Sequence, residues 1–183
     1  DKIAESHLTT GSKTILKVET AEKVLLWEPF NEQHRAIYRI NCNLYKNREG
    51  SKLIFEEVNE DLGLRFRYGW SFSEQYGIVK NASLVNLSEE EIRVEILDGV
   101  QNVLPHGVGQ ELQNSKSTLV DAYKRSELEN DSGIGIYALS AIIVDKGEPS
   151  EALKANLVWS IGIKNPKYLL SSLQLKTFRK GIA

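Results

Sequence analysis

The chain has 183 residues, of which 41% are hydrophobic and 26% are charged, and its formal net charge is -2. This length and composition predict one globular domain, residues 1–183, and exclude a disordered chain. The small net charge gives no electrostatic signature of a nucleic-acid or anionic-membrane partner, so neither is expected.

Alternation of apolar and polar residues predicts strands along most of the chain. In chain order, the expected strands are residues 14–19, 23–27, 35–46, 64–73, 77–86 and 91–100, then two longer and more apolar strands at 133–145 and 152–163. The polar stretch NLSEEE, residues 86–91, is expected to link its two neighbours as in a hairpin. Short strands at this spacing favour an antiparallel two-sheet sandwich over an alternating βαβ fold.

One segment departs from this pattern. Apolar residues recur near helical spacing at Leu112, Leu119, Ala122 and Tyr123. They predict a helical insertion around residues 110–129, with at least one helix near 117–129. The final residues, 173–183, predict a strand that enters a turn. Because residue 1 is Asp and the chain contains no Met, a processed or subcloned piece of a longer polypeptide is expected.

Metal and cofactor signatures are scarce in the sequence. The single cysteine, Cys42, excludes a disulfide framework, and its alternating surroundings predict a small buried strand residue. His7, His34 and His106 lie far apart and show no paired ligand spacing. There is no P-loop, dinucleotide fingerprint, zincin motif or nucleophile elbow. We therefore expect no metal and no cofactor, and we assign no catalytic residue.

The stretch EILDGVQNVLPHGVG, residues 95–109, places polar side chains after an apolar strand. Asp98 precedes a glycine at the predicted end of that strand. It fits a turn carboxylate that accepts backbone N–H bonds, and it also fits a sugar-facing or interface residue. Gln101, Asn102 and His106 carry donors and acceptors that suit a carbohydrate-contacting loop and a domain interface equally well.

Aromatic side chains gather in GWSFSEQYG, residues 69–77. Sugars stack their apolar C–H faces on flat aromatic rings, and polar neighbours then bind the sugar hydroxyls. Aromatic residues also dominate the interiors of β-sandwiches. Trp70, Phe72 and Tyr76 are therefore candidates for carbohydrate binding or a domain interface, with core packing as the alternative.

The segment WSFSEQYGIVKNASLVNLSEEEIRVEILDGVQNVLPHGV, with LVDAYKRSEL and GEPSEALKANLVWSIG further on, resembles a known domain. It is similar to the N-terminal β-sandwich of bacterial glycoside phosphorylases and hydrolases related to cellobiose phosphorylase. The resemblance covers residues 70–163. It implies a two-sheet supersandwich of the galactose-mutarotase type. Such enzymes carry their acid and base carboxylates on a separate (α/α) barrel, and this sequence shows none of the helical-hairpin repeats of a barrel.

The resemblance therefore implies a non-catalytic domain of a glycoside hydrolase or phosphorylase. Its expected partner is the (α/α) barrel of the same polypeptide, whose sugar site it would border. An oligosaccharide and a second copy of the chain are further expected partners, in the cytoplasm or periplasm of a bacterium. Two alternatives stay open: a free-standing carbohydrate-binding module, and a mutarotase-type sugar epimerase. The epimerase needs a general acid and base at the sugar ring, for which His34 and His106 are the candidate histidines.

Overall fold

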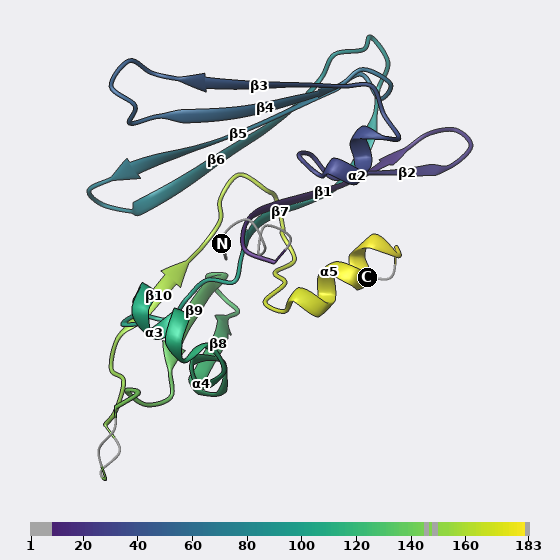
Figure 1. The fold of residues 1–183 in the computed structure, drawn as a ribbon. Coiled ribbons are helices and arrows are strands. Elements are labelled where there is room, and N and C mark those ends of the chain that lie inside the picture. Colours follow the sequence, from purple (N-terminus) through teal and green to yellow (C-terminus); the bar gives the residue numbers. More distant parts are fainter. Residues whose placement is uncertain (1–8, 145–146, 148–149, 182–183) are drawn as a thin grey trace. The chain divides into compact units, whose positions relative to one another are not determined.

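The computed structural model describes residues 9–144, 147 and 150–181, and it is built mainly from antiparallel strands (Figure 1). The chain divides into two compact units. We call residues 14–98 the central unit, and residues 1–13 with 99–183 the terminal unit. The single sandwich domain expected over residues 1–183 stays a prediction.

The central unit contains a four-stranded antiparallel sheet in the order β3-β4-β5-β6 (Figure 1). Its strands are β3 Ile40–Lys46, β4 Leu53–Asn59, β5 Leu64–Ser73 and β6 Gly77–Asn86. The bounds of β5 and β6 are those predicted from the alternation. Their hairpin pairs Leu64 with Asn86 at one end and Ser73 with Gly77 at the other. Gly77 has a φ of 69°, a left-handed conformation that glycine adopts without steric cost.

A second sheet has the strand order β2-β1-β7. Its strands are β1 Gly11–Glu19, β2 Val24–Trp27 and β7 Arg93–Gln101. Since β6 belongs to one sheet and β7 to the other, residues 86–91 cross between sheets. The expected hairpin at this point is therefore wrong.

The two sheets share one hydrophobic core. Its buried residues come from both sheets and from the turn after β4: Leu16, Val18, Trp27, Leu62, Leu64 and Phe66. Leu16 and Val18, like Leu64 and Phe66, are two residues apart, so alternation brings each pair to one face of its strand. The prediction of a mainly β, antiparallel chain is confirmed.

Polar groups are also buried in this core. The carboxylate of Glu57 accepts hydrogen bonds from the indole Nε1 of Trp27 at 2.9 Å and from the backbone N of Phe30 at 2.7 Å. A short helix, α2 Glu32–Arg35, follows and is capped by the side chain of Asn31. Because this helix occupies the start of the predicted strand 35–46, β3 begins only at Ile40.

Cys42 is exposed on β3, which is an edge strand of its sheet, so the predicted burial is wrong. Its Sγ accepts a hydrogen bond from Arg35 at 3.4 Å and lies 3.5 Å from a carboxylate oxygen of Glu57. Partial desolvation and the neighbouring Glu57 raise the pKa of the thiol. Both effects disfavour the thiolate, the reactive form of the side chain.

The terminal unit contains a small sheet in the order β10-β9-β8 (Figure 1). Its elements are α3 Gln110–Ser115, α4 Ser117–Tyr123, β8 Lys124–Glu129, β9 Ile134–Leu139, β10 Ala155–Val158 and α5 Ser172–Arg179. The helical insertion thus ends at Tyr123, and residues 124–129 form a strand instead. The strands predicted at 133–145 and 152–163 are both shorter than expected.

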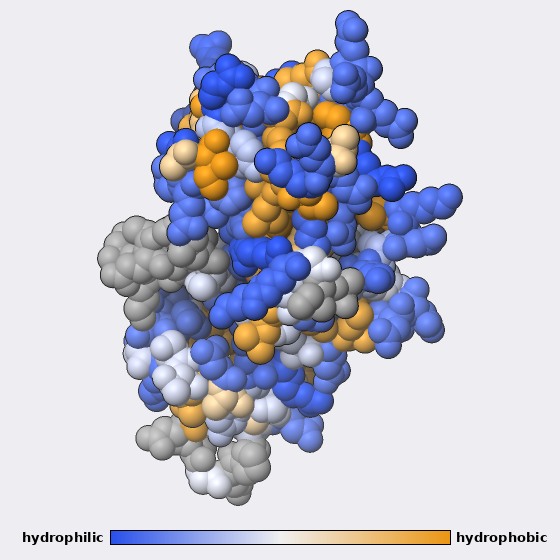
Figure 2. Space-filling model, turned by 90° about the vertical axis from the view of Figure 1, so that its right-hand side faces the viewer, coloured by the Kyte–Doolittle hydropathy of each residue, from blue (hydrophilic) through white to orange (hydrophobic). Residues whose placement is uncertain are grey.

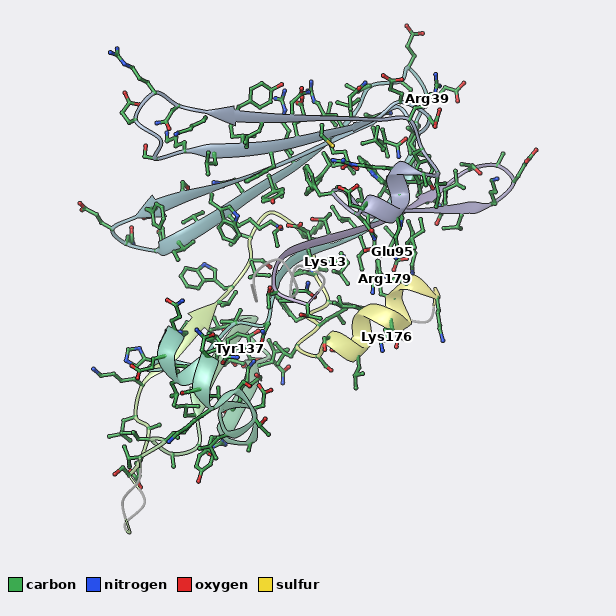
Figure 3. The ribbon with its side chains drawn as sticks, viewed as in Figure 1. Lys13, Arg39, Glu95, Tyr137, Lys176 and Arg179 are labelled. Atoms are coloured by element: carbon green, nitrogen blue, oxygen red, sulfur yellow. The ribbon has the colours of Figure 1, made fainter. Side chains whose placement is uncertain are left out.

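The C-terminal residues form helix α5, where a strand was expected. A capping box explains its start: the side chain of Ser171 accepts from the backbone N of Leu173, and the side chain of Gln174 accepts from the backbone N of Ser171. Lys176 and Arg179 lie in the last turn, where positive charge stabilises the helix dipole (Figure 3).

Candidate functional site

The four-stranded sheet presents two faces, which we call inner and outer. Residues directly opposite each other in antiparallel strands share a face. The inner face contains Phe66, a core residue, and carries Tyr68, Trp70 and Phe72 further along β5. Tyr68 stacks on Phe55 with ring centroids 4.9 Å apart, and burial raises the pKa of its hydroxyl. The aromatic row thus runs out of the core along one strand.

The inner face becomes accessible beyond Tyr68 on β5 and β6, and also level with Tyr68 on the edge strand β3. Leu44, Phe72 and Ile78 are 62%, 77% and 67% exposed, and Phe72 and Ile78 are directly opposite each other. We call Leu44, Trp70, Phe72 and Ile78 the apolar end of the inner face. On the face drawn in Figure 2, apolar residues likewise reach the surface between polar side chains.

Two of the predicted site residues lie at or beside this apolar end. Trp70 is half-buried on β5, where Leu53 and Lys80 are its cross-strand partners. Tyr76 is exposed in the turn between β5 and β6, and its backbone N donates to the Oγ of Ser73 at 3.2 Å. Neither aromatic side chain belongs to the buried core, so both can contact a partner.

Asp98 occupies a different place from the one predicted. It lies inside β7 and not in a turn, and its Oδ1 accepts from Lys80 Nζ at 2.7 Å and Thr14 Oγ1 at 2.5 Å. The side chains of Lys80 and Asp98 are only 8% and 18% exposed. The Lys80 ammonium also lies 5.6 Å from the centroid of the Tyr68 ring. Asp98 thus joins the two sheets through a buried ion pair, and its interpretation as a turn carboxylate is wrong.

The other three predicted residues belong to the terminal unit. Gln101 ends β7, and Asn102 adopts a φ of 55° and accepts a hydrogen bond from Lys124 Nζ at 2.9 Å. His106 is exposed in a turn closed by a hydrogen bond from the N of Val108 to the carbonyl of Pro105. The predicted set is therefore divided between the units. Lys80, which sequence reasoning missed, is the partner that gives Asp98 its role.

The outer face carries a polar cluster that sequence analysis did not identify. Asn43, Glu56, Arg67 and Ser83 form one cross-strand row over the four strands. Glu56 is almost fully buried, and its Oε1 accepts from Asn43 Nδ2 and the hydroxyl of Tyr45, each at 2.9 Å, while its Oε2 pairs with Arg67. Burial alone would raise the pKa of Glu56, but these hydrogen bonds outweigh burial and lower it. Glu56 is therefore ionised at neutral pH.

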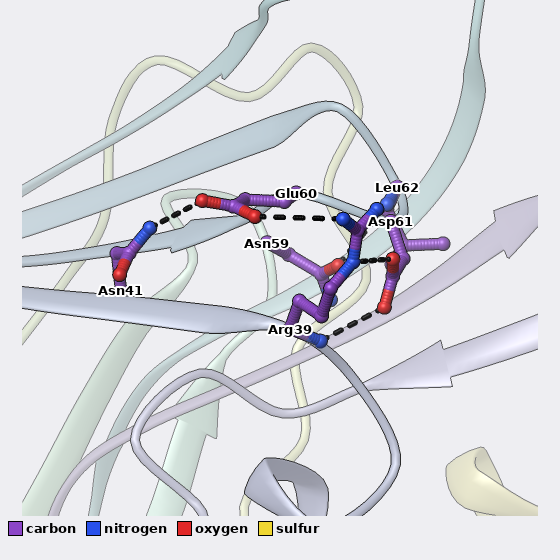
Figure 4. A network of polar contacts seen from close by, with 6 residues as sticks. All are labelled: Arg39, Asn41, Asn59, Glu60, Asp61 and Leu62. Carbon is purple, nitrogen blue, oxygen red and sulfur yellow. Dashed lines mark hydrogen bonds and ion pairs between the residues drawn. The ribbon is translucent and has the colours of Figure 1, made fainter.

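A second polar network closes one end of the sheet (Figure 4). Asp61, in the turn after β4, accepts from the backbone N of Arg39 at 2.8 Å and from its Nε at 2.7 Å. Glu60 pairs with Arg39 at 4.0 Å and accepts from Asn41 at 2.5 Å. The backbone bond, followed by the side-chain bond from Arg39, lowers the pKa of Asp61. This network fixes the β4–β5 turn to the start of β3.

Acid should weaken this network. Because the pKa of Asp61 is lowered by folding, its contribution is complete above the ordinary carboxyl pKa of 3.8 and is lost as the pH falls through the lowered value. We expect Asp61→Asn to destabilise the chain at pH 7 and the difference from wild type to shrink below pH 4. Urea unfolding at both pH values measures this. Asp121→Asn, at an exposed position of α4, is the control, and an Asp61→Asn difference independent of pH would contradict the prediction.

The terminal unit has an open hollow of about 340 Å³, lined by β8, β9 and residues 151–153. Its Arg125 and Glu127 pair with each other at 2.6 Å, and none of the predicted site residues lines it. Within residues 9–144, 147 and 150–181, no group of three or more His, Cys, Asp or Glu side chains could hold a metal ion. None of the described helices has the length and apolar character needed to cross a lipid bilayer.

Neither a protein-family model nor a curated protein sequence matches the chain.

Proposed function

We propose that this chain is a non-catalytic β-sandwich of a carbohydrate-active enzyme and that the apolar end of its inner face docks on the catalytic domain of the same polypeptide. The two sheets would then form part of a galactose-mutarotase-like supersandwich. That catalytic domain would be an (α/α) barrel with the acid and base carboxylates of a glycoside hydrolase or phosphorylase.

The observation that carries the proposal is the exposure of Leu44, Phe72 and Ile78 on a face whose other end is a closed core. Phe72 and Ile78 are directly opposite each other, and Leu44 lies on the edge strand of the same face. Large apolar side chains exposed together at a surface are typical of protein contacts, and burying each one fully is worth about 1.5–3 kcal/mol. A sheet face that is half core and half uncovered is suited to packing against a further domain.

The composition of the apolar end favours a protein over a sugar as its occupant. A sugar platform needs flat rings with amide or carboxylate groups beside them. Leu44 and Ile78 are aliphatic, and the neighbouring Asp98 is already bound by Lys80 and Thr14. Trp70 and Tyr76 would then lie in or beside the domain interface. Its border would be the nearest part of the central unit to the enzyme's sugar.

Coexpression tests the proposal. The reading frame that contains this chain is expected to encode a helical-repeat segment with paired carboxylates. Tagged 1–183 should copurify with that segment, and Phe72→Ser/Ile78→Ser should abolish copurification while changing stability by less than ~1 kcal/mol. Ile37→Ser, at another exposed apolar position of the central unit, is the matched control. A reading frame without helical repeats, or full copurification of the double variant, would contradict the proposal.

The same protein preparation separates the two alternatives. Mutarotation of glucose or galactose by the chain would favour the sugar epimerase. Glycan binding that disappears in Trp70→Ala would favour the carbohydrate-binding module. We expect neither activity from the chain alone, because the acid and base carboxylates of the proposed enzyme belong to its barrel.

A further inference from the structure

We propose that the outer face of the four-stranded sheet binds a carboxylate group between Arg65 and Arg67. This site lies on the opposite face of the sheet from the apolar end, so its failure and the failure of the docking proposal are distinguishable. Three features of the sheet point to this site: the charge balance of the outer polar cluster, one buried donor and the side chains that surround it.

The outer polar cluster consists of Asn43, Tyr45, Glu56, Arg67 and Ser83 together with Arg65, so it contains two guanidinium groups and one carboxylate. Among the outward-facing residues of β3 to β6, Glu56 is the single acidic residue. Its two oxygens are already occupied by Asn43, Tyr45 and Arg67. The two guanidinium groups of Arg65 and Arg67 thus face a single carboxylate, and one positive charge is not neutralised by any other outward-facing residue of β3 to β6.

Arg65 is the guanidinium left without a hydrogen-bonded acceptor. Its Nε is buried, lies 3.9 Å from Glu56 Oε2 and has no hydrogen-bond partner among the described residues. Buried donors on charged groups are costly when unpaired, and such a group in a folded protein points to a missing water, ion or ligand. Val58 and Val85 are the cross-strand neighbours of Arg65, and neither side chain offers an acceptor.

The geometry favours a carboxylate as the missing acceptor. Arg65 and Arg67 are two residues apart on β5 and share a face, so their Cα atoms are ~6.6 Å apart. Guanidinium groups bind carboxylates through paired N–H donors, and a carboxylate between these two would complete the charge balance. Both side chains are partly exposed, at 31% and 40%, so a ligand can reach them.

The neighbours of the arginine pair add groups that suit a hydroxylated ligand. Tyr45 is exposed and its ring lies 5.7 Å from the guanidinium carbon of Arg67. Asn43 and Ser83 are exposed in the same cross-strand row. A hexuronic acid combines a carboxylate for the arginines, a ring for Tyr45 and hydroxyls for the amide and the serine. An acidic peptide side chain would offer the carboxylate alone.

Nuclear magnetic resonance of the arginine Nε–H groups in nitrogen-15-labelled 1–183 tests the site, with sodium D-glucuronate as the probe at constant ionic strength. We expect saturable shifts at Arg65 and Arg67 with a dissociation constant in the millimolar range, and none with glucose. A titration with acetate distinguishes a sugar acid from other carboxylate ligands. Weaker binding by acetate supports a sugar acid, while equal binding assigns the site to a carboxylate of any origin, including an acidic side chain.

Two variants make the test specific. Arg65→Gln removes the surplus charge and should weaken glucuronate binding about tenfold or more, whereas Arg93→Gln, an exposed arginine of β7, should not change it. Glu56→Gln removes the internal competitor and should strengthen binding. Unchanged binding in Arg65→Gln, equal shifts with glucose, or no shift at either arginine would overturn the proposal. If Glu56→Gln fails to fold, Arg65→Gln still decides.

Discussion

Replacement of Asp98 by alanine is expected to lower the free energy of unfolding by about 3–5 kcal/mol. The change removes the carboxylate that pairs with Lys80 at 2.7 Å, and the side chain of Lys80 is only 8% exposed. Burying an uncompensated charge is far costlier than losing a surface ion pair. Thermal or urea unfolding of the purified variant measures the effect.

The double variant Lys80→Met/Asp98→Ala separates the cost of the stranded charge from the value of the pair itself. Replacing a buried ion pair with apolar groups is often neutral or stabilising, so the double variant should recover most of the loss. Arg93→Ala, which breaks an exposed ion pair with Glu19 on the same sheet, should cost no more than ~1 kcal/mol. An Asp98→Ala effect as small as that of Arg93→Ala would show that the Lys80 ion pair is not a buried one.

Trp27→Ala is expected to cost a similar amount, about 3–5 kcal/mol, for a different reason. Trp27 is fully buried between the sheets, so its removal leaves a cavity among Leu16, Leu64 and Phe66. It also removes the indole N–H that donates to Glu57 at 2.9 Å. The free energy of unfolding from urea titration, followed by circular dichroism, measures the combined loss.

Trp27→Phe divides that loss into packing and hydrogen bonding. Phenylalanine fills much of the cavity but cannot donate to the buried Glu57, so about 1–3 kcal/mol should remain. Phe72→Ala, at an exposed position of the sheet, should stay within ~0.5 kcal/mol of wild type. A Trp27→Phe variant as stable as wild type would mean that the hydrogen bond to Glu57 contributes nothing.

The strands that sequence analysis predicted best are those whose alternation is complete. In β5, aromatic and arginine residues alternate, and both of its bounds were predicted correctly. β4 was missed because Glu56 and Glu57 are adjacent acidic residues, which interrupts the alternation of apolar and polar residues. The fold buries both of them, on opposite faces of the sheet. β8 was assigned to a helix because the charged stretch Lys124–Glu129 shows no clear period.

The site was harder to predict than the strands, since its partners lie far apart in the sequence. Asp98 was among the residues predicted for the site, but its hydrogen-bond partners Lys80 and Thr14 are 18 and 84 residues away. Only the pairing of sheets brings them together, and an Asp-Gly sequence suggests a turn just as strongly. Arg65 and Arg67 were visible as polar residues of an alternating strand. The register of the strands places Asn43, Tyr45 and Glu56 on the same face as these arginines. Only then does it become apparent that two positive charges lie beside a single negative one.

The crossing at residues 86–91 has a consequence for how the chain folds. The pairs β3–β4, β4–β5 and β5–β6 join strands that follow one another in sequence, so the four-stranded sheet can form from local hairpins. β1 instead pairs with β7, and the bond from Thr14 to Asp98 closes a separation of 84 residues. Such non-local pairing slows folding. During synthesis, β1 and β2 leave the ribosome long before β7 exists, so the edge of β1 that pairs with β7 must stay free of other strands until β7 is made.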